Sequence, residues 1–139
     1  MLFRSLGEAE DVREEFAAAG LALVPLVAPT TTPERRAQIC AVAHGFVYVV
    51  STVGTTGERA EVPVSLAALV EATKADASTP VAVGFGIGSA AQAAEVGRIA
   101  DGVIIGSRLV RAAAEAGGPE EAADAVAGFL SESRVALAG

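Results

Sequence analysis

Short apolar runs alternate along the chain with segments in which apolar residues recur every three or four positions. The runs are too short for helices and fit strands covered on both faces. Strands are predicted at 21–28, 46–51, 81–85 and 103–105. Amphipathic helices are predicted at 8–19, 33–44, 66–73, 90–98, 109–116 and 120–130. After one leading helix, the chain therefore repeats a strand followed by a helix.

The ends of these helices carry local start and stop signals. Thr32 has a hydroxyl that can cap a helix beginning at Pro33, and Gly45 ends that helix. Ser89 and Gln92 have the spacing of a capping box. His44 falls in the last turn before Gly45, where a partial positive charge complements the helix dipole, and we favour this role over catalysis.

The order of elements restricts the fold. Strands that alternate with helices pair in parallel, because each helix carries the chain back across the sheet. An open doubly wound sheet and part of a (β/α)8 barrel both fit, and in both the ligands bind at the carboxyl ends of the strands. The strand-to-helix junctions are uncharged and rich in Gly, Ser and Thr; they lie at 28–31, 51–57, 85–88 and 105–107.

Two of these junctions have the composition of a phosphate site. Glycine lets backbone N–H groups approach a ligand, and a helix start adds unpaired N–H groups and a positive dipole end. The junctions are Gly-Ile-Gly at 86–88 and Gly106 with Ser107, on consecutive strands. The alternative is that these glycines only form tight turns. Two adjacent sites, one with Ser107 at a helix start, favour phosphate.

A dinucleotide site at 84–88 (GFGIG) is a weaker interpretation of the same glycines. A Rossmann fingerprint needs an acidic residue at the end of the next strand. Asp101 precedes that strand instead of ending it, so we interpret Asp101 as a solvated turn residue. We therefore discount a nicotinamide or flavin dinucleotide.

Composition and net charge exclude some classes of binding partner for this chain. The length of 139 residues suits one domain, and 10 Lys+Arg against 17 Asp+Glu give a net charge of −7, which argues against a nucleic-acid surface. The apolar runs are too short to span a bilayer, and we expect a soluble protein with no membrane partner. Cys40, the single cysteine, excludes an intrachain disulfide and fits a cytoplasmic location. Its place between Ile39 and Ala43 on an apolar stripe indicates core, not nucleophile.

Candidate catalytic chemistry is sparse. Tyr48 lies on a strand of alternating faces, where its hydroxyl can point into a barrel interior; a buried core tyrosine is the alternative. No predicted strand end carries an acid, a base or a metal-ligand cluster. The residues therefore predict a binding cradle without general acid–base machinery and without a metal site.

Two long runs carry a family resemblance: PLVAPTTTPERRAQICAVAHGFVYVVSTVGTTG, followed by PVAVGFGIGSAAQAAEVGRIADGVIIGSRLV. Together they resemble the second half of the tryptophan synthase α subunit, with matches in order from about residue 20 to 110. The segments GFGI and DGVIIGS recur loosely in other phosphate-binding barrels. The pattern APT...GFVY.VS..G.TG is much more diagnostic.

The resemblance implies the fifth to eighth strands of a (β/α)8 barrel that cleaves indole-3-glycerol phosphate by a retro-aldol reaction. The products are glyceraldehyde 3-phosphate and indole, which passes to a β subunit that holds pyridoxal phosphate; the α subunit itself needs no cofactor. By motif, Tyr48 lines the indole pocket, Ile104 packs against substrate, and Thr56 matches the threonine of a loop that closes over the site. The phosphate is assigned to Gly57, Phe85, Gly86, Gly106 and Ser107.

The chain departs from the family pattern in two ways. Thr55 stands where valine is usual and Thr52 where arginine is frequent, which puts the strength of loop closure in doubt. The family's catalytic glutamate and aspartate belong to and follow the second barrel strand, whereas this chain begins shortly before the fifth. We therefore expect the isolated chain to be inactive or nearly so.

A full barrel takes about 250 residues, so 139 residues correspond to half of one. A stand-alone half-barrel that binds a phosphorylated metabolite or forms a dimer is the alternative to a fragment of the lyase. Residues 2–5 are also what the terminal bases of a common sequencing adapter, CTCTTCCGATCT, encode. We expect residues 1–5 to be non-native and the chain to come from a truncated gene model; an ordinary frayed terminus is the alternative.

Overall fold

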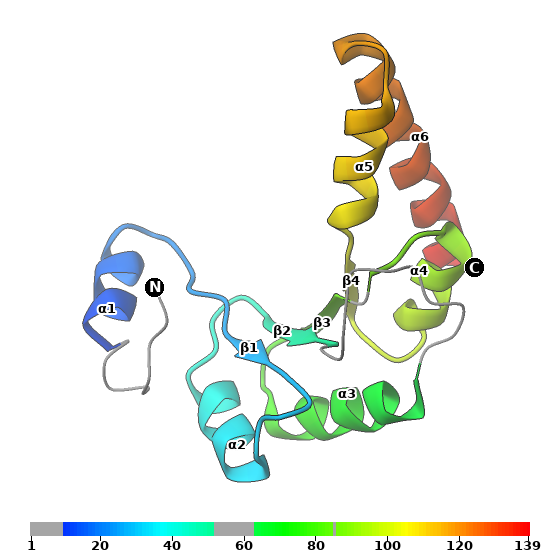
Figure 1. Cartoon of the computed structure of the whole chain (residues 1–139). Helices are drawn as coiled ribbons and strands as arrows, with labels where there is room; N and C mark the ends of the chain where they lie inside the picture. The colour runs from blue at the N-terminus through cyan, green and yellow to red at the C-terminus, as the bar shows by residue number, and fades with distance from the viewer. Residues whose placement is uncertain (1–9, 52–62, 85) are drawn as a thin grey trace.

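The computed structural model of the protein describes residues 10–51, 63–84 and 86–139 (Figure 1). Its elements follow in the order α1 (Glu10–Ala18), β1 (Leu26–Val27), α2 (Pro33–Ala41), β2 (Val47–Val50), α3 (Val64–Asp76), β3 (Val81–Gly84), α4 (Ala90–Gly97), β4 (Gly102–Ile104), α5 (Ser107–Glu115) and α6 (Pro119–Ala138). The predicted alternation of strands and helices is confirmed. Within the described residues, no helix is long and apolar enough to cross a membrane.

The four strands form one parallel sheet in the order β1-β2-β3-β4. Strands that are consecutive in the sequence are therefore neighbours in the sheet. A doubly wound sheet would reverse its strand order at a switch point, and this sheet does not. Of the two architectures that the sequence allowed, the strand order selects the segment of a barrel.

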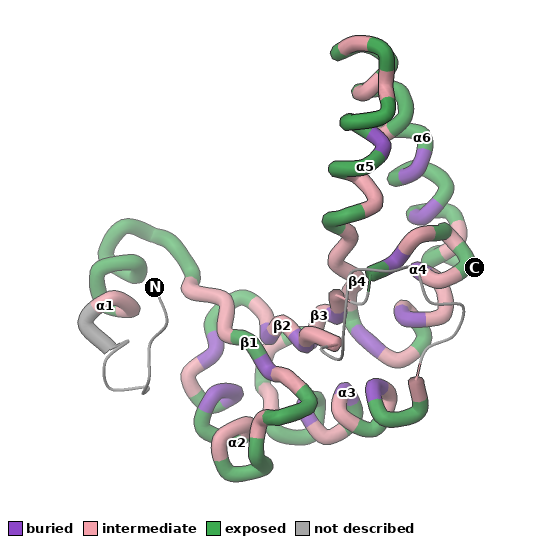
Figure 2. Tube along the Cα trace, viewed as in Figure 1, coloured by how far each residue is buried: buried purple, intermediate pink, exposed green. Residues whose placement is uncertain are grey.

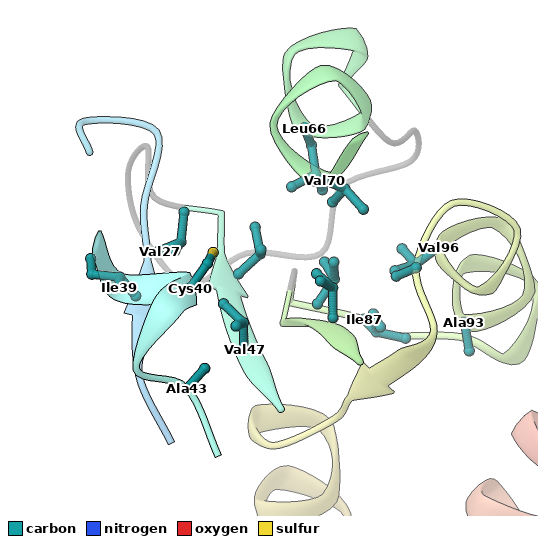
Figure 3. Packing of buried hydrophobic residues seen from close by; sticks show 14 residues of the cluster. Val27, Ile39, Cys40, Ala43, Val47, Leu66, Val70, Ile87, Ala93 and Val96 are labelled. Carbon is teal, nitrogen blue, oxygen red and sulfur yellow. The ribbon is translucent and has the colours of Figure 1, made fainter. Parts of the chain in front are cut away.

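One face of the sheet is covered by helices and forms the core. Val27, Val47, Val49, Val81 and Val83 have no exposed surface. Figure 3 shows the side chains packed around them, which come from α2 (Ile39, Cys40) and Ala43 just after it, from α3 (Leu66, Val70) and from α4 (Ala93, Val96). The apolar stripes predicted for the second and third helices are thus confirmed as core.

The other face of the sheet carries the alternate residues and is more open. Tyr48 and Val50 are half-buried although their neighbours Val47 and Val49 are fully buried, as the alternating colours of β2 in Figure 2 show. Leu26, in register with Tyr48, is 56% exposed. The prediction that all strands are covered on both faces is therefore wrong: the helices of the described chain cover one face only.

The first strand is also shorter than predicted. Only Leu26 and Val27 of the run 21–28 belong to it, and it pairs with β2 alone. Pro25 has no N–H to donate, although its carbonyl accepts from Tyr48 N at 2.9 Å. A run of apolar residues becomes a strand only where a neighbouring strand satisfies its backbone, and the described chain offers residues 21–24 no such neighbour.

The helix ends agree with the predicted signals, with three corrections. Thr32 caps α2, since its Oγ1 accepts from Arg35 N at 3.3 Å. Gly45 has a positive φ of 82°, but it does not end α2, which already ends at Ala41. His44, however, lies beyond α2 and not in its last turn, because the chain tightens after Ala41 into a turn in which Val42 N–H donates to the Ile39 carbonyl at 3.3 Å. The last helix is longer than predicted and runs to Ala138.

Candidate functional site

The candidate site lies at the carboxyl ends of the strands, where the strand-to-helix junctions meet. The first junction, after β1, is closed on itself. Ala28 N–H donates to Thr31 Oγ1 at 3.0 Å, and Thr31 N–H donates back to the Ala28 carbonyl at 2.9 Å. The N–H groups of Ala28 and Thr31 are thus hydrogen-bonded within the turn.

The junction after β3 combines an open glycine with a capped helix. Gly86 is exposed and has φ = 60°, a conformation that favours glycine, whereas Ile87 is 2% exposed and anchors the loop in the core. Ser89 Oγ accepts from Gln92 N at 3.3 Å, which confirms the predicted cap of α4. Gln92 Oε1 accepts from Gly88 N at 2.8 Å, one residue earlier than in a standard capping box. Two backbone N–H groups at the start of α4, those of Gly88 and Gln92, are therefore already bonded to side chains.

The junction after β4 is the open one. Gly106 is the N-cap of α5 and supplies no side-chain cap, and Ser107, the first residue of α5, is exposed. The first N–H groups of a helix have no partner within it, and they carry the positive end of its dipole. A Cβ built on Gly106 would meet nothing within 4 Å, so the space beside this helix start is free of the described chain. This helix start can accept an anion.

Tyr48 and Ile104, both predicted to line a substrate pocket, lie on the same open face of the sheet. Gly84 lies between them, in register with Val50 on one side and Ile104 on the other. A Cβ on Gly84 would overlap the ring and hydroxyl of Tyr48. Tyr48 therefore leans across β3 over a residue without a side chain. The sequence singled out Tyr48 but missed Gly84, whose role depends on the register of β2 and β3.

Three of the predicted site residues, Thr56, Gly57 and Phe85, lie outside the described residues. Of the others, the structure brings Gly86, Gly106 and Ser107 to the carboxyl end of the sheet and places Tyr48 and Ile104 on its open face. In the described ranges, no three His, Cys, Asp or Glu residues gather in a way that could hold a metal ion.

The ion pairs found in the described ranges lie away from the glycine junctions, toward the amino ends of the strands. Asp101, just before β4, accepts from Lys74 Nζ at 2.7 Å and from Val81 N at 2.9 Å. These bonds, Lys74 first, lower the pKa of Asp101 from its ordinary value. Arg36 Nε donates to Asp76 Oδ2 at 2.7 Å and links α2 to α3. Asp101 is an exposed residue before β4, as predicted, and its carboxylate also joins α3, β3 and β4.

Cys40 is core, as predicted. It is 1% exposed, and its Sγ donates to the Thr73 carbonyl at 3.9 Å. Burial raises the pKa of the thiol, with a smaller contribution from Asp76. A thiol in this setting is a poor nucleophile.

A cavity of about 410 Å³ lies at the opposite end of the sheet from the glycine junctions, between α1 and the segments that precede β1 and β2. It is lined by Arg13, Glu14, Ala17, Gly20, Leu21, Ala22, Leu23, Val42 and His44. Its position separates it from the predicted substrate residues.

Comparison with known proteins identifies relatives of the chain. A family model described as "Tryptophan synthase alpha chain" matches residues 5–137. The tryptophan synthase alpha chain of Burkholderia pseudomallei is 45% identical over 132 residues, which are 95% of this chain and 48% of the relative. That of Streptomyces coelicolor is 49% identical over 111 residues, or 80% of this chain and 40% of the relative.

Solved structures give the same result. The structure of Mycobacterium tuberculosis tryptophan synthase contains a chain that superposes with a TM-score of 0.82 at 36% identity, over 95% of this chain and 48% of that one. The tryptophan synthase subunit alpha of Legionella pneumophila superposes with a TM-score of 0.77 at 33% identity. The chain spans about half the length of these relatives, and its sheet corresponds to half of their (β/α)8 barrel.

Proposed function

The chain belongs to the tryptophan synthase alpha chain family, and on that premise we propose that it supplies the phosphate-binding half of a site for indole-3-glycerol phosphate. In this family's reaction, a retro-aldol cleavage releases indole and glyceraldehyde 3-phosphate in a step of tryptophan biosynthesis. We assign the chain to the cytoplasm with that pathway. The β subunit, with its pyridoxal phosphate, is the partner of the complete enzyme.

The open start of α5 is the observation that carries the proposal. A phosphate placed beside Gly106 would meet the unpaired N–H groups of the first turn and the positive end of the helix dipole. Ser107 adds a hydroxyl donor at the same point. Gly86, exposed with φ = 60° at the end of the neighbouring strand, brings further backbone within reach of the ligand. Gly57 and Phe85 complete the proposed phosphate set.

The indole ring is assigned to the open face of the sheet. Tyr48 and Ile104 lie there beside Gly84, whose missing side chain makes room for the Tyr48 ring itself. An apolar surface with one hydroxyl suits an aromatic group that carries a single N–H. Thr56 is proposed to act in the loop that covers this ligand.

The isolated 139-residue chain is proposed to bind without turnover. The cleavage requires one group that protonates the indole carbon and another that removes a hydroxyl proton. Within the described residues, the carboxyl ends of β1 to β4 offer amides and hydroxyls but no carboxylate. We propose that the chain positions the substrate and that the family's acid and base belong to another polypeptide segment.

Binding is tested by titrating the chain with glyceraldehyde 3-phosphate and with inorganic phosphate. Tyr48 is the only tyrosine and the chain has no tryptophan, so intrinsic fluorescence reports directly on the site. Indole-3-glycerol phosphate, which itself absorbs, is titrated by calorimetry. We expect Ser107→Asp to weaken each phosphate ligand about tenfold or more, or about 1.4 kcal/mol, because it puts a negative charge at the helix start.

The matched control is Ser131→Asp, which adds the same charge at an exposed position of α6. If both variants weaken binding equally, net charge is responsible and the proposed site is wrong. If inorganic phosphate binds as tightly as indole-3-glycerol phosphate, the chain is a general binder of phosphorylated metabolites, as in the stand-alone alternative. Release of indole by the purified chain would contradict the proposed lack of turnover.

A further inference from the structure

Helix α5, which begins at the proposed phosphate site, carries its charged residues in the order opposite to the one that its dipole favours. Arg108 is its second residue, Arg111 follows about one turn later, and Glu115 is its last residue. The first turn of α5, all of it within the described residues, contains no acidic side chain. A helix dipole favours acidic side chains near the start and basic ones near the end. The start of α5 therefore combines a positive dipole end with a positive side chain.

Helix α2 also has arginines near its start, but there the positive charge is compensated. Glu34 lies in its first turn, and Arg36 Nε donates to Asp76 Oδ2 at 2.7 Å. Among the described residues, no carboxylate forms such a pair with Arg108. The net charge of the chain is −7, so composition does not account for an uncompensated positive charge at this point. Departures from a local rule are expected at functional sites, and this one favours an anionic ligand.

Phe129 holds the guanidinium of Arg108 in a defined place. Arg108 Cζ lies 5.0 Å from the centroid of the Phe129 ring, and Phe129 is 7% exposed. The ring belongs to α6, which lies beside α5 (Figure 1). An aromatic face attracts a guanidinium within about 6 Å and leaves its charge intact, whereas a carboxylate would neutralise it. The contact therefore keeps a full positive charge next to the first turn of α5.

We propose that Arg108, held against Phe129, raises the affinity of the site for phosphorylated ligands by adding a fixed positive charge beside the N–H groups at the start of α5. A phosphate group carries a charge of about −1.5 to −2 at neutral pH, so both the guanidinium and the dipole end attract it. Phe129 is a positioning residue, since it acts through Arg108. The inference rests on the proposed function, which places the phosphate beside Gly106 and Ser107.

The alternative is that Arg108 serves only to pack α5 against α6. A long uncharged side chain would cover the Phe129 ring equally well, without repulsion from the positive end of the α5 dipole. The charge at this position is therefore not explained by packing, and a phosphorylated ligand at the start of α5 would supply the missing partner.

The test compares two ligands in Arg108→Gln, which removes the charge and keeps a long polar side chain. By calorimetry, the Kd of glyceraldehyde 3-phosphate should rise about fivefold at low salt. Indole, which is uncharged, should bind as it does to the unchanged chain. The matched control is Arg98→Gln at the end of α4, toward the opposite end of the sheet, and it should alter neither Kd. Equal losses in both variants would assign the effect to net charge and overturn the proposal, as would an equal loss of indole binding.

Salt dependence separates the electrostatic role of Arg108 from a structural one. At about 1 M salt the Debye length is about 3 Å, so a charge that acts without direct contact is largely screened. The difference in Kd between the unchanged chain and Arg108→Gln should therefore approach zero at high salt. A difference that persists there would show that the substitution altered the structure of the site, and it would overturn the proposal.

Two further variants test the role of the Phe129 ring. Arg108→Lys keeps the charge and should bind glyceraldehyde 3-phosphate within about twofold of the unchanged chain. Phe129→Leu keeps an apolar side chain but frees the guanidinium, and we expect a loss of about twofold. Added to Arg108→Gln, Phe129→Leu should cause no further loss, because the charge that it positions is already gone. Additive losses would contradict a positioning role for Phe129.

Failure of this inference is distinguishable from failure of the proposed function. If Ser107→Asp weakens phosphate binding and Arg108→Gln does not, the phosphate site stands and the role of Arg108 is refuted. If the unchanged chain binds neither glyceraldehyde 3-phosphate nor inorganic phosphate, the proposed function is refuted, and the role of Arg108 with it.

Discussion

Val49 and Val50 are adjacent residues of the same type on one strand, yet they occupy opposite environments. Val49 has no exposed surface and packs against the helices, whereas Val50 is half-buried on the open face with Tyr48 and Ile104. The same division runs through β3, where Val81 and Val83 are buried and Ala82 and Gly84 are not. The difference shows that residue type makes a side chain suitable for a core, but a covering layer makes it part of one.

The largest expected difference between the two faces is in thiol accessibility. Cys40 lies on the buried side of α2, and burial raises the pKa of its thiol, so it should react with an alkylating agent only when the chain opens. A cysteine introduced by Val50→Cys in a Cys40→Ala background should react at least about a hundredfold faster, equivalent to about 2.7 kcal/mol of opening free energy. Mass spectrometry of the alkylated protein measures both rates. Equal rates would show that the open face is covered in solution.

Truncation of the two neighbouring valines to alanine should lower the free energy of unfolding by different amounts. Val49→Ala removes two buried methyl groups and leaves a cavity, at a cost of about 2 kcal/mol in the free energy of unfolding. Val50→Ala should cost less than about 1 kcal/mol, because the side chain is already half in solvent. Urea unfolding followed by Tyr48 fluorescence gives both values, and a cost at Val50 equal to that at Val49 would contradict the division into faces.

Two glycines of the sheet, Gly84 and Gly102, test whether a Cβ clashes with Tyr48 or whether the sheet tolerates no alanine at a glycine position. Gly84→Ala places a methyl group where the Tyr48 ring lies, while Gly102→Ala meets only Ala82 Cβ at 3.6 Å, an ordinary contact. Because the face is open, the ring can move, and we expect a cost of about 1 kcal/mol with a clear change in Tyr48 fluorescence. Gly102→Ala should leave the spectrum unchanged. An unaltered spectrum in Gly84→Ala would disprove the position of Tyr48 over β3.

The smallest expected effect on the free energy of unfolding is at Asp101. This residue helps to determine which residues of β3 and β4 lie on the covered face of the sheet and which lie on the open face. Asp101 N–H donates to the Val81 carbonyl at 2.9 Å while its carboxylate accepts from Val81 N, and this double contact sets the register of β3 and β4. A slip of one residue would exchange the two faces. Asp101→Asn should cost less than about 1 kcal/mol at neutral pH, since the pair with Lys74 is partly exposed.

The pH dependence of that cost follows from the lowered pKa of Asp101. The unfolded chain has the ordinary value of 3.8, so the carboxylate contributes its full stability above that pH. The contribution is lost as the pH falls through the lower value of the folded state. The difference in the free energy of unfolding between Asp101→Asn and the unchanged protein should therefore shrink as the pH falls into the acid range.

Local signals in the sequence predicted most of the elements and several of their ends. The caps at Thr32 and Ser89 depend on contacts within a few residues, and the apolar stripe of Ile39, Cys40 and Ala43 follows from their spacing. The sequence therefore shows both features directly. The glycine junctions after β3 and β4 were recognisable for the same reason. Their roles in phosphate binding stay predictions that the titration above addresses.

What the tertiary structure decided depends on contacts between residues distant in the chain. The order β1-β2-β3-β4 distinguished a barrel segment from a doubly wound sheet, and pairing reduced the run 21–28 to Leu26–Val27. The register placed Gly84 under Tyr48. Asp101 bonds to Lys74, 27 residues away in the sequence, and to Val81, 20 residues away. The amino-acid sequence by itself determined which side chains can be buried and where helices start and stop. Only the tertiary structure decided which face of the sheet is covered, because that depends on where the helices pack and not on the sequence of the strand itself.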